Sequence, residues 1–323
     1  MSLYLVTGVA GFIGSSLASA LLEAGERVRG LDNLSTGKRE NLAEIADRID
    51  FRQADLLDPA ACADACRGVD YVLHQAALAS VPRSVADPVS THASNVDGTL
   101  NLLVAARDAK VKRVVYAGSS SVYGDAPTLP KREDMPPDPI SPYAASKLAG
   151  ELYMTSFYRV YGLETVTLRY FNVFGPRQDA NSQYSGVLAR FITQMLQDEQ
   201  PTIFGDGEQS RDFTYVDNVV KANLLASKAP AAAIAGRVFN TATGKRYTLN
   251  QTFNVLKKIT GYGGTARYGP GRVGDIKHSL ADIALAERRL GYKPHVGFEQ
   301  GLEHTVAWYR TQIGAKSAAT PAF

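Results

Sequence analysis

Short apolar runs and longer segments of helical periodicity alternate along the first half of the chain. The runs are rich in aliphatic and β-branched residues, whereas the longer segments repeat their apolar positions every three to four residues. The predicted strands are Leu3–Thr7, Arg27–Leu31, Ile49–Gln53, Tyr71–His74, Arg113–Ala117 and Glu164–Tyr170, and the clearest helices are Val89–Asp108 and Tyr143–Tyr161. Strands and helices that alternate in this way form a parallel sheet covered on both faces, so the pattern predicts an α/β fold.

The pattern changes after Asn172. A polar loop, GPRQDANSQYSG, precedes a predicted helix over Val187–Gln197, and shorter strand and helix patterns follow it. We therefore predict a smaller C-terminal α/β substrate lobe. The expected ranges are 1–171 for the sheet domain, with later segments at about 211–240 returning to it, 172–313 for most of the discontinuous smaller lobe, and 314–323 for a flexible tail of small and polar residues.

The first strand runs directly into a glycine-rich turn, TGVAGFIG. Gly8 permits a sharp turn, Gly11 lets backbone N–H groups approach a pyrophosphate at a helix N-terminus, and Gly14 allows close packing of helix on strand. Asp32, at the end of the second strand, is placed to accept hydrogen bonds from an adenosine ribose and to repel a 2′-phosphate. A glycine turn in a nucleotide-free domain would not need this acid. The segment predicts a Rossmann-type doubly wound sheet that binds NAD.

A candidate catalytic pair lies in the segment SPYAASKLAGE. Tyr143 and Lys147 are four residues apart and share one face of the predicted helix. A neighbouring ammonium favours the phenolate, so Tyr143 is suited to act as a general base. A serine cluster, Ser119 to Ser121, follows the fifth strand and places a hydroxyl at the same sheet edge. At least one of the three serines could equally belong to an ordinary turn.

Composition and charge narrow the class of protein. The 323 residues are 45% hydrophobic and 21% charged, with a net charge of +3. These values are typical of a globular protein, and the absence of a long Lys and Arg run argues against a nucleic-acid surface. No apolar stretch has the length of a membrane span. Because the first strand begins at Leu3, we expect no signal peptide, no membrane association and a cytoplasmic location.

The two cysteines, Cys62 and Cys66, lie four residues apart in a predicted helix and would share a face. A metal pair is conceivable there. However, no histidine or further cysteine lies near them in the sequence, and two ligands make a poor zinc site. We therefore expect reduced structural thiols and no metal site.

Taken together, these motifs resemble the extended short-chain dehydrogenase/reductase family, and within it the nucleotide-sugar 4-epimerases. The resemblance is greatest to bacterial UDP-N-acetylglucosamine and UDP-glucose 4-epimerases, and it covers nearly the whole chain, including DNLSTGK, HQAA, SSSVYGD, YAASK, RYFNVFGPRQ, RDFTYVDNV and GDIKHSLAD. It implies that Ser119, Tyr143 and Lys147 are the catalytic residues. The residues that it places around NAD are Gly8, Gly11, Phe12, Ile13, Gly14, Asp32, Asn33, Gly37, Lys38, Asp55, Leu56, Ala76, Ala77, Asn95, Tyr143 and Lys147.

The same resemblance implies contacts to a UDP-sugar. Asn172 would hold the diphosphate-sugar, Arg211 and Arg272 would bind the diphosphate, and Asp275 would accept from the uridine ribose. The remaining substrate residues that the resemblance implies are Ser120, Ser121, Val187, Thr202, Phe204 and Ser279, of which Val187, Thr202 and Phe204 would line the uracil pocket. Arg177 is left open between an ion pair and a substrate contact.

The resemblance also implies a redox-neutral reaction. C4 of the sugar is oxidised with NAD, the 4-keto sugar rotates, and it is reduced on its other face. Related 4,6-dehydratases carry Asp-Glu where Ser120 and Ser121 stand, which argues against elimination of water. Ser279 occupies the place of a bulky tyrosine in glucose-restricted relatives and leaves room for a 2-acetamido group.

We therefore expect interconversion of UDP-N-acetylglucosamine and UDP-N-acetylgalactosamine, and of UDP-glucose and UDP-galactose. The alternatives are a UDP-glucose 4-epimerase without acetamido activity and a UDP-glucuronate 4-epimerase, although the latter often has threonine at the position of Asn172. A non-catalytic NAD-binding regulator is disfavoured because Tyr143 and Lys147 are both present. The family usually forms homodimers through two helices, here Val89–Asp108 and Ser146–Tyr161.

Overall fold

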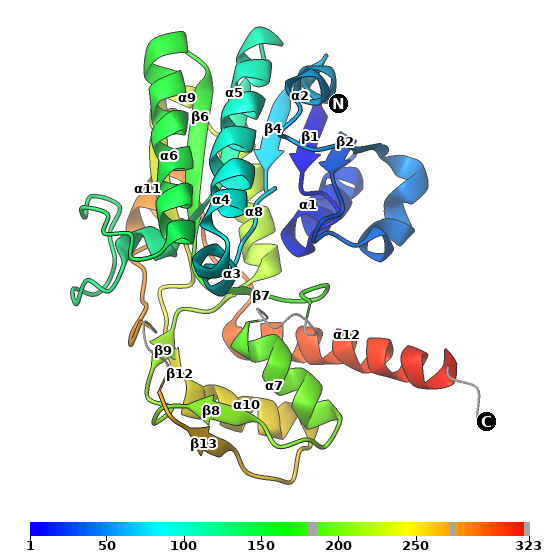
Figure 1. Ribbon diagram of the computed structural model, residues 1–323, viewed down its shortest axis with the longest axis vertical. Helices are drawn as coiled ribbons and strands as arrows, with labels where there is room; N and C mark the ends of the chain where they lie inside the picture. Colours follow the sequence, from blue (N-terminus) through cyan, green and yellow to red (C-terminus); the bar gives the residue numbers. More distant parts are fainter. Residues whose placement is uncertain (180–185, 272–275, 320–323) are drawn as a thin grey trace.

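The computed structural model describes the backbone of residues 1–179, 186–271 and 276–319, and the side chains of these residues as far as 314 (Figure 1). Within them, seven parallel strands form one sheet in the order β11-β6-β5-β4-β1-β2-β3. The strands are β1 (Leu3–Thr7), β2 (Arg27–Asp32), β3 (Asp50–Gln53), β4 (Tyr71–His74), β5 (Arg113–Ser119), β6 (Glu164–Tyr170) and β11 (Arg237–Thr241). The six predicted strands are confirmed, as is the doubly wound fold, and the late segment β11 adds the edge strand beside β6.

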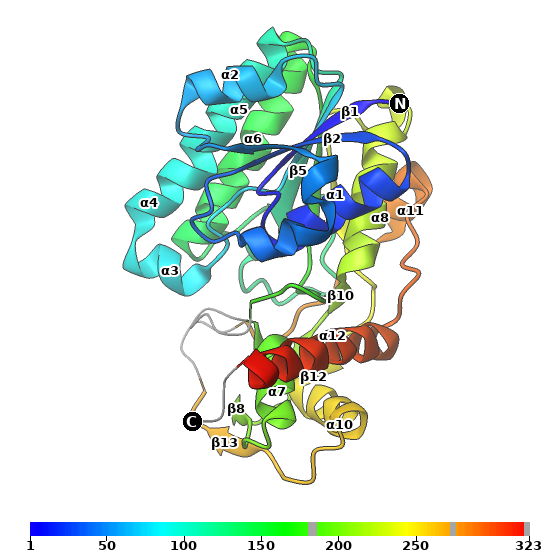
Figure 2. The ribbon, with the colours of Figure 1, turned by 90° about the vertical axis from the view of Figure 1, so that its right-hand side faces the viewer.

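Two layers of helices cover the sheet, one on each face (Figure 2). One layer is formed by α1 (Phe12–Glu23), α8 (Val216–Lys228) and α11 (Ala284–Leu290), and the other by α2 (Pro59–Cys66), α5 (Gly98–Asp108) and α6 (Pro142–Tyr161). The alternation of side chains along β1 explains this arrangement. Tyr4 and Val6 enter the core beneath α1 and α8, whereas Leu3 and Leu5 enter the core beneath α2 and α5. Both faces of the strand are apolar because both are buried.

The helix predicted over Val89–Asp108 is divided into three parts. After α3 (Val81–Ala86), α4 covers Pro88–His92, a π-helical turn covers Ala93–Asp97, and α5 follows. Asn95 lies in that turn and is buried. Its Oδ1 accepts from the Leu78 N–H at 2.8 Å, and its Nδ2 donates to Ser146 Oγ at 2.9 Å. The wider turn thereby lets one amide join the loop after β4 to α6.

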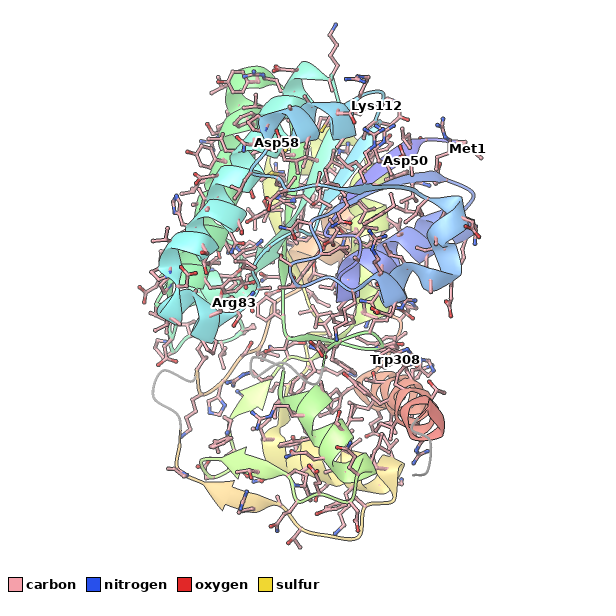
Figure 3. The ribbon with its side chains drawn as sticks, turned by 45° about the vertical axis from the view of Figure 1, so that its right-hand side comes forward. Met1, Asp50, Asp58, Arg83, Lys112 and Trp308 are labelled. Atoms are coloured by element: carbon pink, nitrogen blue, oxygen red, sulfur yellow. The ribbon has the colours of Figure 1, made fainter. Side chains whose placement is uncertain are left out.

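A smaller lobe lies beyond the carboxyl ends of the sheet strands (Figure 1). Its helices are α7 (Val187–Leu196), α10 (Leu249–Thr260) and α12 (Phe298–Ala319), and its strands pair as β7 (Val173–Phe174) with β10 (Thr214–Tyr215), β8 (Thr202–Phe204) with β13 (Arg267–Gly269), and β9 (Ser210–Arg211) with β12 (Tyr247–Thr248). A separate aromatic core including Phe174, Phe213 and Phe298 holds these segments together. In Figure 3, Trp308 of α12 lies at the junction of the two lobes.

The remaining connections differ in length. They contain η1 (Arg39–Arg48), η3 (Ser120–Tyr123) and α9 (Ala231–Ile234). Residues 314–319, which we expected in a flexible tail, continue α12 as helix. In the described part of the chain, no helix is both long and apolar enough to cross a membrane.

Candidate active site

The glycine-rich turn after β1 forms part of the wall of a cleft at the carboxyl edge of the sheet. Gly8 has a φ of +67°, and a Cβ there would lie 2.8 Å from the Cα of Ala76. A Cβ on Gly14 would overlap the carbonyl oxygen of Gly8. Because neither position accommodates a side chain, the turn packs tightly against the loop after β4. α1 therefore begins at Phe12 with its N-terminus, and its unpaired N–H groups, at the carboxyl edge of the sheet.

Asp32 closes one end of this cleft. Its side chain is buried, and its two oxygens accept from the backbone N–H groups of Ala10 at 2.9 Å and Leu34 at 2.8 Å. Burial raises the pKa of Asp32, and these two hydrogen bonds oppose the rise. Each carboxylate oxygen has further acceptor capacity for a ribose hydroxyl.

A small cavity of about 100 Å³ lies beside Asp32. Asn33 and Asp55 form part of its wall and are joined by a hydrogen bond of 2.7 Å from Nδ2 to Oδ2. The predicted cofactor residues in this wall are Gly8, Gly11, Asp32, Asn33, Gly37, Asp55, Leu56, Ala76 and Ala77. Of the others, Lys38 instead forms an exposed ion pair with Asp179 at 3.1 Å, and the amide of buried Asn95 is engaged with Leu78 and Ser146.

The catalytic candidates meet at the ends of β5 and α6. Ser141 caps α6 by accepting from the Ala144 N–H at 3.1 Å, and this fixes Tyr143 in the first turn and Lys147 one turn later. Ser119, the last residue of β5, has its Oγ 2.8 Å from Ser121 Oγ, and it lines the same cavity as Tyr143 and Lys147. The structure thus brings the predicted serine, tyrosine and lysine together.

Burial is the main cause of the pKa shifts of Tyr143 and Lys147. It raises the pKa of Tyr143, and the neighbouring polar side chain of Ser119 partly offsets this rise. It lowers the pKa of Lys147 to about 7, because an ammonium loses its hydration there. Tyr143 therefore requires additional positive charge nearby before its phenolate can form at neutral pH.

One cavity of about 1000 Å³ joins these residues to the smaller lobe. Its wall includes Phe12, Ile13, Ser119, Ser120, Ser121, Tyr143, Lys147, Asn172, Arg211 and Ser279. A second cavity of about 280 Å³ shares Asn172 and Arg211 with the first and adds Val187, Thr202 and Phe204. The two cavities together form a path from the catalytic hydroxyls into the smaller lobe. Arg272 and Asp275 lie outside the described residues.

A buried carboxylate, which the sequence did not single out, fixes the smaller-lobe side of the cavity. Asp212 accepts from the N–H groups of Thr243, Gly244 and Ala281 at 3.0 to 3.2 Å. Its own carbonyl accepts from Asn172 Nδ2 at 3.1 Å. Asp212 therefore ties together the segments that carry Asn172, Arg211 and Ser279. These partners are distant in the sequence, so no local motif marks the contact.

Gln75 is another residue that the sequence did not identify. It follows β4 directly and lines both the small cofactor cavity and the catalytic cavity. Its Oε1 accepts from the Tyr170 hydroxyl at 3.1 Å. Its position immediately after a strand, at the carboxyl edge of the sheet, is the available signal for such a residue.

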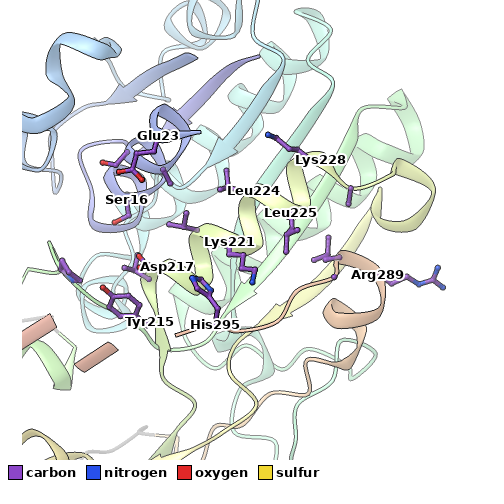
Figure 4. Close-up of a pocket in the computed structure, with 18 of the residues that line it drawn as sticks. Ser16, Glu23, Tyr215, Asp217, Lys221, Leu224, Leu225, Lys228, Arg289 and His295 are labelled. Carbon is purple, nitrogen blue, oxygen red and sulfur yellow. The ribbon is translucent and has the colours of Figure 1, made fainter. Parts of the chain in front are cut away.

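Arg177 lies away from the catalytic cavity. It lines a separate open groove of about 1130 Å³ between α1, α8 and α11, together with Glu23, Asp217, Lys221 and His295 (Figure 4). The positive charge of Arg177 lowers the pKa of Asp217, although burial raises it more. This groove shares no lining residue with the catalytic cavity. Arg177 is thus placed in a different hollow from the predicted substrate residues, and its role stays open between an ion pair and a substrate contact.

The two cysteines are free and fully buried in α2. Burial raises the pKa of each thiol to about 12, so both are unreactive. Across the described residues there is no group of three or more His, Cys, Asp or Glu side chains with metal-binding geometry.

Comparison with known proteins places this architecture in context. Residues 4–242 match the model of the NAD dependent epimerase/dehydratase family. A UDP-glucose 4-epimerase of Mycolicibacterium smegmatis is 40% identical over 316 residues, covering 95% of this chain and 98% of that protein. Two solved structures are similar over 96% of this chain and 99% of their own. One is a UDP-glucose 4-epimerase of Thermotoga maritima with UDP-glucose (TM-score 0.91, 41% identity), and the other is a UDP-N-acetylglucosamine 4-epimerase of Methanobrevibacter ruminantium in complex with UDP-N-acetylmuramic acid (TM-score 0.92, 43% identity).

Proposed function

Because the chain belongs to the NAD-dependent epimerase/dehydratase family, we propose that it is a UDP-sugar 4-epimerase acting on UDP-N-acetylhexosamines and on UDP-hexoses. The observation that carries this proposal is the single cavity in which Ser119, Tyr143 and Lys147 face the smaller-lobe residues Arg211 and Ser279. A sugar nucleotide bound along this path would present its C4 hydroxyl to the catalytic group. The reaction leaves no net redox change.

The residues of the glycine turn fit NAD, the family's cofactor. The tight packing of Gly8 and Gly14 leaves backbone N–H groups free to face a pyrophosphate at the N-terminus of α1. Asp32 would accept from the adenosine ribose, with Asn33, Gly37, Asp55 and Leu56 around the adenosine. The chemistry that bound NAD would supply there is reversible hydride transfer with sugar C4.

Tyr143 has the central role in proton transfer. It would take the proton of the C4 hydroxyl, directly or through Ser119, and return it after the 4-keto sugar has turned its other face. Lys147, one helical turn away, favours the phenolate by its charge. Ser120 and Ser121 line the same wall and supply neutral hydroxyls for the sugar, where a dehydratase would need an acid–base pair.

The smaller lobe would hold the rest of the substrate. Arg211, at the junction of the two cavities, is suited to the diphosphate, and Asn172 beside it to the link between diphosphate and sugar. Val187, Thr202 and Phe204 line a pocket of a size and polarity that suit uracil. By family resemblance, Arg272 and Asp275 would add contacts to diphosphate and ribose. A tethered diphosphate allows the keto sugar to rotate without leaving.

Ser279 supports the acceptance of 2-acetamido sugars. It lines the same cavity as Tyr143 and Lys147, and its short side chain would leave volume beside a bound sugar ring. A UDP-glucose 4-epimerase without acetamido activity is the second candidate, and a UDP-glucuronate 4-epimerase is the third, which the asparagine at position 172 disfavours. A non-catalytic NAD-binding regulator is the least favoured, because the tyrosine and lysine are retained.

The working form that we propose is a homodimer in the cytoplasm. Val89 of α4 and Leu152 and Val160 of α6 are more than half exposed, although all three are large and apolar. An apolar surface on adjacent helices is typical of a subunit interface. Two free, unpaired cysteines are consistent with a reducing compartment.

The test is an assay of the purified protein with UDP-glucose, UDP-N-acetylglucosamine and UDP-glucuronate, with the sugar products separated. Tyr143→Phe should lower turnover by roughly 10²- to 10⁴-fold, the range for a general acid–base group, while the UDP-sugar still binds. Tyr158→Phe, which alters an exposed tyrosine of the same helix, is the control. Ser119→Ala should have a milder effect, since water can take part in the relay. Normal turnover of Tyr143→Phe would exclude Tyr143 as the base.

A further inference from the structure

Lys147 rests on the face of a second tyrosine, Tyr116, which plays no part in the mechanism above. The Nζ atom of Lys147 lies 4.2 Å from the centre of the Tyr116 ring. Tyr116 is in the middle of β5 and is fully buried. An ammonium at this distance over an aromatic face is attracted by the ring's negative π surface, and the attraction is strongest where water is excluded.

The Tyr116 ring is held in place on three sides. A Cβ on Gly150 of α6 would overlap the Tyr116 hydroxyl, so glycine at this position allows the ring to fit under the helix. The hydroxyl donates to the Lys147 carbonyl at 3.4 Å. On another side lies the ring of His74, with the centroids 5.5 Å apart.

His74 is itself fixed and uncharged. Its Nδ1 lies 2.7 Å from Thr7 Oγ1, and its Nε2 lies 2.9 Å from Thr99 Oγ1. Burial lowers its pKa to about 3, and the Lys147 charge contributes in the same direction. Thr7 of β1, His74 of β4 and Tyr116 of β5 therefore pack together as an uncharged group beneath Lys147.

No carboxylate balances the Lys147 charge in the described part of the chain. Lys147 forms no ion pair within 4 Å there, and the acid one turn away, Glu151, accepts from Nε and from one terminal nitrogen of a different cation, Arg169. Among the described residues, the aromatic face of Tyr116 is thus the group in contact with Lys147 Nζ that can offset the burial of the ammonium.

We propose that Tyr116 is a positioning residue whose ring keeps Lys147 protonated and directed at Tyr143. The inference rests on the proposed roles of Tyr143 and Lys147 in 4-epimerisation. A neutral lysine would not favour the phenolate, so without the ring Tyr143 would ionise only at higher pH. The Tyr116 hydroxyl is not required for this effect, whereas the ring is.

The experiment compares Tyr116→Phe, Tyr116→Met and a variant with 3,4,5-trifluorophenylalanine at position 116. The trifluoro ring keeps the shape of phenylalanine but loses its negative face. We expect Tyr116→Phe to keep kcat within about threefold of the unmodified enzyme, with the same pH profile. The trifluoro variant and Tyr116→Met should each lose about tenfold in kcat at pH 7, and their acidic limb should move up by about one pH unit. Activity should recover toward higher pH.

A second measurement separates this inference from the proposed function. The pKa of Lys147 can be followed by NMR of the NAD-loaded protein labelled with ¹³C at lysine Cε, whether or not the protein turns over any sugar. It should fall by about one unit from Tyr116→Phe to the trifluoro variant. Thermal unfolding and bound nucleotide serve as controls for the fold. An unchanged Lys147 pKa and an unchanged pH profile in the trifluoro variant would overturn the inference. A loss of kcat in Tyr116→Phe as large as that in Tyr116→Met would also overturn it. An inactive wild type with the expected Lys147 shift would refute the proposed activity alone.

Discussion

At the scale of single residues, His74, which packs against Tyr116, also makes the free energy of unfolding depend on pH. It is fully buried between Thr7 and Thr99, and burial lowers its pKa to about 3 from an ordinary value of 6.5. Between these values the unfolded chain binds a proton that the folded chain does not, so the free energy of unfolding falls as pH decreases. His74 alone should contribute about 1.4 kcal/mol of loss per pH unit below pH 6.5.

Glutamine does not bind a proton in this pH range, so the variant His74→Gln tests this prediction. The variant should be less stable than the unmodified protein at pH 7, because the hydrogen bonds of the imidazole with Thr7 and Thr99 are altered. Between pH 7 and pH 5, however, it should lose less stability than the unmodified protein does. Urea unfolding at both pH values measures the difference. Parallel losses in the two proteins would show that His74 does not titrate on unfolding.

We predict that Ser279, which lines the large cavity, controls selectivity among UDP-sugars. If its small side chain leaves room beside C2, then Ser279→Tyr should fill that room. Overpacking of a formed pocket costs about 1–3 kcal/mol, which corresponds to roughly 5- to 150-fold in rate. The loss in kcat/KM should fall on UDP-N-acetylglucosamine and spare UDP-glucose, with Ser279→Ala as the size-matched control. Equal losses on both sugars would mean that Ser279 does not gate the acetamido group.

At the scale of elements, a buried ion pair joins α6, which carries the proposed catalytic residues Tyr143 and Lys147, to β6. Glu151 and Arg169 are 7% and 4% exposed, and Arg169 donates from Nε at 2.9 Å and from a terminal nitrogen at 2.6 Å. Glu151→Gln keeps the shape of the side chain but leaves Arg169 as a buried charge without its counterion. Removal of one partner of a buried pair costs about 3–5 kcal/mol.

The control is an exposed pair, Arg132 with Asp134. Asp134→Asn should cost less than about 1 kcal/mol, because both side chains are hydrated. The free energy of unfolding in urea measures both variants under the same conditions. Similar small costs for Glu151→Gln and Asp134→Asn would show that the buried pair does not hold α6 in place.

The elements that were predictable from the sequence are those whose signal is local. The strands β1, β4 and β6 have their predicted ends because apolar runs and turn residues mark them. The π-helical turn around Asn95 was not predictable, since its cause is a contact with a distant loop. The two- and three-residue strands of the smaller lobe pair with partners far along the chain, and such pairing leaves no periodic signal.

The same distinction applies to the site. Glycine spacing and the pair Tyr143 and Lys147 are local patterns, so the sequence identified them. Tyr116 and His74 lie within apolar strands and look like ordinary core residues. Only the packing of β4 and β5 against α6 shows that they support the lysine.

At the scale of the whole molecule, the exposed apolar residues of α4 and α6 bear on the oligomeric state. These helices lie side by side on the sheet face opposite α1 and α8 (Figure 2). Leu152 is 61% exposed and Val89 is 78% exposed, which is unfavourable for a monomer in water. In a two-fold dimer the same patch of each copy contacts the other, so the exposed apolar residues of α4 and α6 would be buried on both copies.

Leu152→Glu should therefore convert the proposed dimer into a monomer. A two-fold interface would contain the new carboxylate twice, and burying two unpaired like charges costs far more than the contact of two leucines gains. Sedimentation velocity gives the mass, with Tyr268→Glu, an exposed apolar residue of the smaller lobe, as the matched control. Ser119, Tyr143 and Lys147 line one cavity within a single copy of the chain, so we expect the monomeric variant to keep its turnover per subunit. A wild type that sediments as a monomer would contradict the dimer, and a Leu152→Glu variant that remains dimeric would place the interface on another face.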